Sequence, residues 1–181
     1  GPGGPRIQVD GKAVPPRMFF GYESPGKVAA AHEWSAQGFE FTPPADVPGN
    51  GTLHFRFGPV TGDVWLADLR LTDLEGRDVL PAGSFATEKG FAEVWNVYPP
   101  DERNTVGKAE VAGGALHVSL RRPAGGDWPD FHLHSHILLR LQAGQRYRVS
   151  FRVQASPERA IVPALYRVAG GSWHPVGGPP G

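Results

Sequence analysis

The chain has 181 residues, enough for one domain with a substantial core, and its 18 basic and 18 acidic residues give a formal net charge of zero. A chain without excess positive charge lacks the electrostatic footprint of a nucleic-acid-binding protein. Cysteine is absent, which excludes disulfides and thiolate metal sites. No apolar run approaches the length of a membrane span. We therefore expect neither a nucleic-acid partner nor a membrane partner.

The amino-terminal segment is predicted to lie outside the main domain. Residues 7–9 and 12–14 flank Asp10-Gly11, a pair that favours a two-residue β-hairpin turn. We assign residues 1–21 to a linker with this hairpin, residues 22–177 to the domain, and residues 178–181 to a second linker. No signal peptide precedes the hairpin in this sequence.

The rest of the chain reads as a succession of strands. Apolar and polar residues alternate with a period of two, which gives a strand one buried and one solvated face. The 25 glycines and 19 prolines fall largely between these segments and predict turns. No segment predicts a clear helix, and residues 27–34 are only a weak candidate. The pattern predicts an all-β fold, an antiparallel two-sheet β-sandwich of jelly-roll type. The principal strand segments are residues 39–41, 53–57, 64–71, 79–85, 116–120, 131–134 and 147–153.

The apolar members of these alternating segments form the predicted core, since each strand should bury one face. They are Phe41, Leu53, Phe55, Phe57, Leu66, Leu116, Val118, Leu133, Val149, Phe151 and Val153.

Three motifs occur at residues 53–57 (LHFRF), 64–71 (VWLADLRL) and 79–85 (VLPAGSF). Together they resemble a family 4/9-like carbohydrate-binding module: the first two resemble its closing strands, and the third resembles its opening strand. The opening motif follows the closing motifs here, with residues 72–78 as a short connector between them. The resemblance therefore implies a circularly permuted jelly roll, covering roughly residues 28–177, in which residues 64–71 and 79–85 lie close together.

The resemblance implies that the chain binds saccharide without catalysing a reaction. The expected ligand is a β-linked polysaccharide of glucan, xylan or mannan type, bound in a groove across one sheet. The segment VDGKAVPPRMFFG at residues 9–21 resembles the entry segment of some barrel-type glycoside hydrolases. We therefore expect an attached catalytic domain, a secreted or extracellular location with the signal sequence outside this chain, and a monomer.

Aromatic side chains are the first candidates for saccharide contacts, because the apolar face of a sugar ring stacks on a π surface. Trp128 and Trp173 lie in glycine-rich turns where a large ring has no strand to bury it; they could instead plug the ends of the sandwich. Trp95 and Tyr98 could line the groove, although a core position for Trp95 fits equally well. Tyr166 completes this set.

Histidines are the second candidates. His132 and His134 alternate with Phe131 and Leu133, so both imidazoles should project from one face of a strand. Such a pair could form a solvated face, contact sugar, or bind zinc or copper. His54 and Arg56 alternate in the same way on another strand and could join the same surface.

The resemblance also implies that calcium is a possible cofactor, because relatives often hold a structural calcium with carboxylates of the closing and opening strands. Here Ala67 precedes Asp68, and Ala86 follows Phe85 where a glutamate is usual. Asp68 is the best remaining candidate, and fewer carboxylates weaken a calcium site.

The sequence contains no phosphate-binding glycine loop, nucleophile elbow or His-Glu-x-x-His motif. It also has no closely spaced carboxylates of the kind a glycosidase needs. We therefore expect no enzymatic activity. The alternatives are a structural accessory domain of a glycoside hydrolase that binds no glycan, and a metal-binding jelly-roll protein that uses the strand with His132 and His134.

Overall fold

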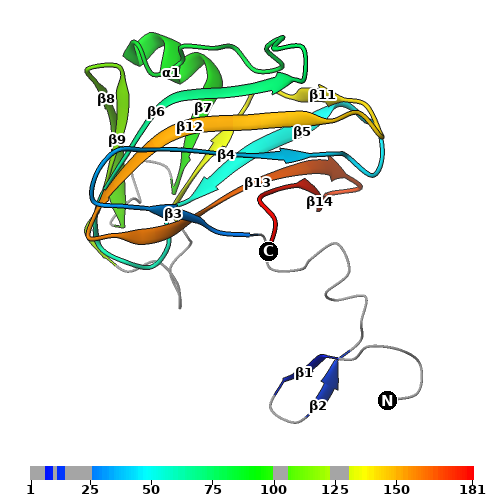
Figure 1. Cartoon of the computed structure of the whole chain (residues 1–181), viewed down its shortest axis with the longest axis horizontal. Coiled ribbons are helices and arrows are strands. Elements are labelled where there is room, and N and C mark those ends of the chain that lie inside the picture. The colour runs from blue at the N-terminus through cyan, green and yellow to red at the C-terminus, as the bar shows by residue number, and fades with distance from the viewer. Residues whose placement is uncertain (1–6, 10–11, 15–25, 100–105, 123–130) are drawn as a thin grey trace.

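The computed structural model describes residues 7–9, 12–14, 26–99, 106–122 and 131–181, and side chains from residue 26 onward within these ranges. Strands β1 (Ile7–Val9) and β2 (Lys12–Val14) pair antiparallel, as the Asp10-Gly11 turn signal predicts. From residue 26 the chain forms two antiparallel sheets that pack as a sandwich (Figure 1). The predicted all-β two-sheet sandwich is therefore confirmed.

The first layer is a seven-stranded sheet, whose main path runs β14, β13, β5, β10, β7. Two short strands lie off this path: β11 pairs with β5, and β3 pairs with β13. The strands are β3 (Val28–Ala30), β5 (Val47–Arg56), β7 (Trp95–Tyr98), β10 (His132–Ser135), β11 (Leu139–Leu141), β13 (Arg159–Ala169) and β14 (Ser172–Gly177).

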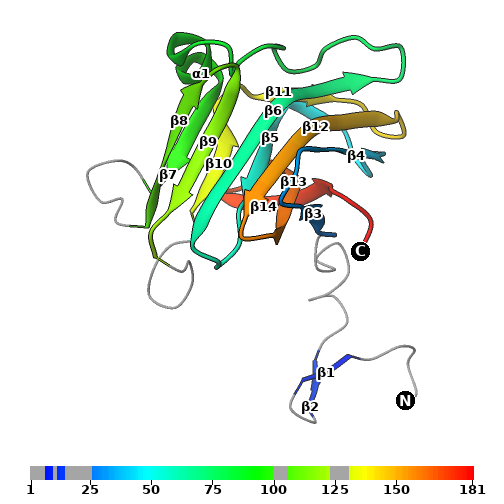
Figure 2. The same ribbon diagram turned by 60° about the vertical axis from the view of Figure 1, so that its left-hand side comes forward.

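The second layer is a five-stranded sheet in the order β4, β12, β6, β9, β8, and Figure 2 shows its strands side by side. Its long central strands β6 and β12 carry much of the apolar alternation seen in the sequence. The strands are β4 (Ser35–Phe41), β6 (Gly62–Asp73), β8 (Gly107–Ala112), β9 (Ala115–Leu120) and β12 (Tyr147–Ser156).

The core lies between the two sheets and contains every residue that the alternation assigns to it. Phe55 and Leu53 on β5 are fully buried, as are Leu66 on β6 and Val149 on β12. Phe41 is the most exposed member of the predicted set, at 7%. One inward face per strand is what two packed sheets require, which is why a period-two pattern identified these residues without any structure.

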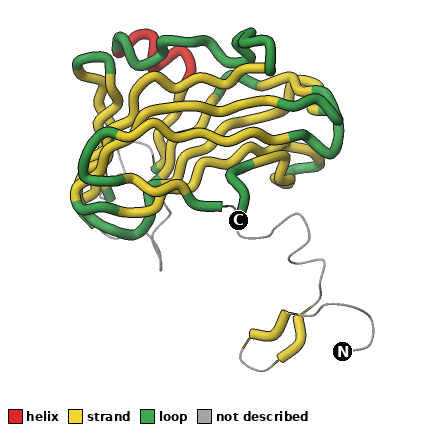
Figure 3. The backbone as a smooth tube through the Cα atoms, in the orientation of Figure 1, coloured by secondary structure: helices red, strands yellow, loops and turns green. Residues whose placement is uncertain are grey.

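The segment of residues 79–85 is not a strand, contrary to prediction. Turns occupy it instead, and helix α1 (Glu88–Val94) follows, with the Thr87 side chain capping it by accepting a hydrogen bond from Gly90 N at 3.0 Å. Figure 3 shows this helix in red above the strands. A helix of seven residues buries too short an apolar stripe to give a clear 3.6-residue period. The weak helix candidate at residues 27–34 is also wrong, because it contains β3.

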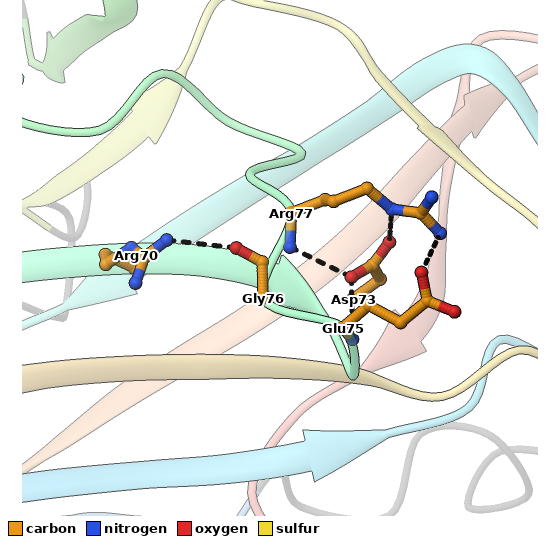
Figure 4. A network of polar contacts seen from close by, with 5 residues as sticks. All are labelled: Arg70, Asp73, Glu75, Gly76 and Arg77. Carbon is orange, nitrogen blue, oxygen red and sulfur yellow. Dashed lines mark hydrogen bonds and ion pairs between the residues drawn. The ribbon is translucent and has the colours of Figure 1, made fainter.

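The turn after β6 nevertheless brings this segment beside the closing strand. The Asp73 carboxylate accepts hydrogen bonds from the backbone N–H groups of Glu75 and Arg77 and from Arg77 Nε, at 2.7–3.0 Å (Figure 4). The Arg77 side chain is the main reason that the pKa of Asp73 is lowered. Val79 N then donates to Leu71 O at 2.8 Å. The expected proximity of residues 64–71 and 79–85 is therefore seen at Leu71 and Val79; the permutation itself stays a prediction.

Residues 178–181, which the sequence analysis assigns to a linker, include a residue that packs against the sandwich. Pro179 is buried, and its carbonyl accepts a hydrogen bond from Gly26 N at 3.1 Å. A side chain at position 26 would collide with the backbone of Pro179 and Pro180. Glycine at this position therefore permits the close approach of the two segments, which lie side by side near the C label in Figure 1.

Candidate functional site

The candidate site lies on the outward face of the seven-stranded sheet, and strand alternation places its side chains there. On β5, Leu53 and Phe55 point into the core, so His54 and Arg56 occupy the opposite face. On β10, Leu133 points inward and leaves the two neighbouring histidines outward. The predicted common face of these histidines is thus confirmed.

Strand register aligns the side chains of this face in rows. One row crosses three strands: Tyr98 lies opposite His132, which lies opposite Arg56. In the next row His134 lies opposite His54. Directly opposed residues have Cβ atoms about 4.5–5.5 Å apart, so each row is a set of contacting side chains.

The far side of the site comes from β13 and β14. Tyr166 lies opposite Thr52 of β5, and Trp173 lies opposite Val168 of β13. Together these strands form a groove of about 350 Å³, within the size range of ligand sites. Its lining residues are His54, Arg56, Tyr98, His132, His134, Tyr166 and Trp173. All seven are among the nine residues that the sequence proposes for saccharide contacts.

His54 is the centre of this ring cluster. Its imidazole stacks with His132 and His134, with ring centroids 5.5 and 5.4 Å away. Tyr166 and Trp173 contact it edge-on, at 5.0 and 5.2 Å. Five rings from four strands therefore pack together, and His54 is only 4% exposed although it belongs to the outward face.

Burial gives the His54 imidazole an unusual polar environment. Its Nε2 lies 2.8 Å from Thr52 Oγ1, whereas its buried Nδ1 has no hydrogen-bond partner among the described residues. Burial lowers its pKa to about 3, and the positive charges of His132, Arg56 and His134 contribute in that order. His54 is therefore a neutral imidazole at physiological pH. Burial also lowers the pKa of His134.

Thr52 is the residue at this site that the sequence reasoning missed. It precedes His54 by two positions, so the alternation that identified His54 and Arg56 also places Thr52 on the same face. Its role could have been inferred from the position, because the Thr52 hydroxyl is placed to form a hydrogen bond with the His54 ring.

Arg56 is held within the groove by Tyr166. Arg56 Nη1 donates to the Tyr166 hydroxyl at 3.4 Å, and the guanidinium carbon lies 5.7 Å from the centroid of the Tyr166 ring. These contacts orient the planar guanidinium against one wall of the groove. Tyr98 and Trp173 are the most exposed rings of the site, at 42% and 48%. An exposed ring at each side of the groove offers a stacking surface to a ligand.

Trp95 does not belong to the groove, contrary to prediction. It is 2% exposed, packs against Phe55 and Phe85, and donates from Nε1 to Ser84 Oγ at 2.9 Å. The sequence already contained the reason: Trp95 and Tyr98 are three residues apart on one strand, and an odd separation puts them on opposite faces. Trp128, which the sequence analysis also proposes for saccharide contacts, lies outside the described residues.

Metal binding finds little support in the geometry. The Asp68 carboxylate, the calcium candidate, accepts from Arg152 Nε at 2.7 Å, whereas calcium takes six to eight oxygen ligands. Within residues 26–99, 106–122 and 131–181, no three His, Cys, Asp or Glu side chains are arranged to hold a metal ion. The rings of His132 and His134, the pair named in the metal alternative, are tilted by 41° with centroids 5.6 Å apart, and the His54 ring stacks on both.

The described lining of the groove contains no carboxylate. Glycoside hydrolysis commonly needs two, one as acid and one as base or nucleophile. The seven described side chains supply aromatic rings, imidazoles and one guanidinium.

Among the described residues, no helix has the length and apolar character needed to cross a membrane. Comparison with family models, curated proteins and solved structures finds no match to this chain.

Proposed function

We propose that this domain binds a β-linked polysaccharide of glucan, xylan or mannan type, without catalysis, in the groove on the outward face of the seven-stranded sheet. The observation that carries the proposal is the aromatic and imidazole lining: Tyr98 and Trp173 are partly exposed rings of the groove, and histidines belong to the same lining. Rings suit the apolar faces of sugars, and neutral imidazole both donates and accepts hydrogen bonds with hydroxyls.

The direction of the groove fits an extended ligand. Tyr98 belongs to β7 and Trp173 to β14, and these strands stand at the two ends of the main strand path. At 4.7–4.9 Å between neighbours, five strands span roughly 19 Å. A polysaccharide lying across the strands would contact several of the lining side chains at once.

A structural accessory domain that binds nothing is less well supported. Such a domain has no need of a groove lined by several rings, and in the described part of this face Tyr98 and Trp173 are exposed rings of one groove. In the proposed role the domain holds an attached, secreted glycoside hydrolase near its substrate and so raises the local substrate concentration.

Replacing Trp173 or His134 with alanine should weaken polysaccharide binding. Loss of one ring that contacts the sugar should weaken the free energy of binding by about 1–3 kcal/mol, judged from the burial of a comparable side chain. Millimolar to micromolar ligands bind with only about 4–8 kcal/mol, so the loss should nearly abolish retardation of the protein in a polysaccharide-containing gel. Affinity electrophoresis against soluble glucans, xylans and mannans measures this, with thermal unfolding to show that the variants fold.

Trp34 provides the matched control. It is similarly exposed, at 39%, but it packs on Arg152 of the five-stranded sheet. Trp34→Ala should leave retardation unchanged. Loss of retardation in Trp34→Ala alone would place the binding surface on the other sheet, and absence of retardation of the parent protein by every polysaccharide would refute the proposal.

A further inference from the structure

His54 lines the groove and forms a buried pair with Thr52. Thr52 is 3% exposed and His54 is 4% exposed. Thr52 Oγ1 lies 2.8 Å from His54 Nε2, and this is the only hydrogen bond of the Thr52 side chain among the described residues. The buried Nδ1 of His54 has no hydrogen-bond partner in the same part of the chain. One nitrogen of this ring is therefore paired and the other is not.

The hydrogen positions of the pair follow from a count of donors and acceptors. Burial lowers the pKa of His54 to about 3, so at physiological pH the neutral ring has one N–H group and one bare nitrogen. If Nε2–H donates to Thr52, the Thr52 hydroxyl hydrogen and the bare Nδ1 both remain unpaired. If the Thr52 hydroxyl donates to a bare Nε2, only Nδ1–H remains unpaired. Because each unpaired buried polar group is unfavourable, the second arrangement is the more stable one.

The unpaired Nδ1–H is unusual, since the large majority of buried polar side-chain atoms in proteins have a hydrogen-bond partner. Among the described side chains, one other buried atom shares this condition, the Oδ1 of Asn50. Asn50 precedes His54 by four residues on β5, and an even separation places both side chains on the same face of the strand. The unpaired groups thus belong to the face of the sheet that forms the groove, where a bound ligand could pair with them.

We propose that Thr52 is a positioning residue of the saccharide site: its hydroxyl donates to His54 Nε2 and so keeps the ring hydrogen on Nδ1, which donates it to an oxygen of the bound saccharide. This inference rests on the proposed function and assigns roles to two residues of its site. Saccharide hydroxyl and linkage oxygens are uncharged acceptors, and a neutral N–H group pairs with them without a buried charge.

Access to Nδ1 requires a neighbouring ring to move, because this atom is buried. Among the described rings that contact His54, Trp173 is the most exposed, at 48%, and it belongs to β14 at the edge of the sheet. Its ring meets the His54 ring edge-on, with centroids 5.2 Å apart. Tyr166, by contrast, accepts a hydrogen bond from Arg56. A sugar that stacks on Trp173 and turns this ring outward would bring its oxygens to Nδ1.

Long-range proton–nitrogen NMR of the unmodified protein tests the position of the ring hydrogen, because protonated and bare ring nitrogens resonate in separate ranges. At pH 7 we expect the hydrogen of His54 on Nδ1 alone, with the variant His54→Gln identifying the signals. The hexasaccharides cellohexaose, xylohexaose and mannohexaose are the probes. A hexasaccharide that binds should shift the signals of His54 Nδ1 and its hydrogen. His117, which contacts Asp63 on the five-stranded sheet, should not respond.

Substitution of Thr52 tests its positioning role. Thr52→Val keeps the shape of the side chain and removes the hydroxyl, so the ring hydrogen is no longer confined to Nδ1. We expect a mixture of both ring tautomers and an affinity about five- to tenfold lower in titration calorimetry, the effect of one hydrogen bond. Thr52→Ser keeps the hydroxyl and should retain both the tautomer and the affinity. Thr72→Val is the matched control, since it removes a similarly buried hydroxyl from β6 of the opposite sheet, and it should change neither.

The outcomes separate this inference from the proposed function. If a hexasaccharide binds while the hydrogen of His54 lies on Nε2, or while Nδ1 does not respond, the inference is wrong and saccharide binding stands. Weaker binding by Thr52→Val without a change of tautomer would assign Thr52 to packing and also overturn the inference. If Thr52→Val does not fold, the NMR response of the parent protein and the affinity of Thr52→Ser decide. If the parent binds none of the hexasaccharides, the proposed function and this inference both fail.

Discussion

Replacing Phe151 with alanine is expected to lower the free energy of unfolding by about 3–5 kcal/mol. Phe151 lies on β12, is 3% exposed, and meets Phe55 of the opposite sheet edge-to-face, with ring centroids 5.4 Å apart. The truncation removes apolar contacts and leaves a cavity between two sheets, each held by its own backbone hydrogen bonds. Because such sheets can close a cavity only in part, we expect the full loss in the free energy of unfolding. Urea denaturation of both proteins measures the difference.

Ser150 is the control for this experiment. It precedes Phe151 on the same strand and therefore belongs to the opposite face, where it is half-buried. Ser150→Ala should change the free energy of unfolding by no more than about 0.5 kcal/mol. A loss below about 1 kcal/mol for Phe151→Ala would mean that this side chain does not fill the core between the sheets.

Acid should destabilise the protein through His54. The pKa of this imidazole is about 3 in the folded protein against 6.5 for the ordinary side chain. Between these pH values the unfolded chain binds a proton at His54 and the folded chain does not, so the free energy of unfolding falls as the pH falls. From pH 7 to pH 4 this one group should account for a loss of about 3 kcal/mol.

The variant His54→Gln isolates this contribution, because glutamine does not titrate. Ionisable groups that do not contact His54, such as the Asp73 carboxylate, affect both proteins alike and cancel in the comparison. Denaturation at pH 7 and pH 4 should therefore show a smaller acid loss in the variant, by about 3 kcal/mol. Equal acid losses in the two proteins would show that His54 accepts a proton in the folded state as readily as in the unfolded chain.

The strands and the core followed from the sequence because they depend on a local rule. A strand in a sandwich buries alternate residues, so the period of two identified Leu53, Phe55 and Leu133 as core. The same rule placed His132 and His134 together on an outward face. The sequence pattern did not predict helix α1, because seven residues with few apolar positions give too weak a helical periodicity.

The pairing of strands was decided only by the tertiary structure. Nothing local in the sequence indicates that β10 inserts between β5 and β7, yet this order forms the row of Tyr98, His132 and Arg56. The burial of His54 has the same origin. Its own strand directs it outward, and rings contributed by β10, β13 and β14 pack against it there. The sequence alone determined which face each side chain occupies, because alternation is a property of one strand; which side chains become neighbours depended on contacts between strands far apart in the chain.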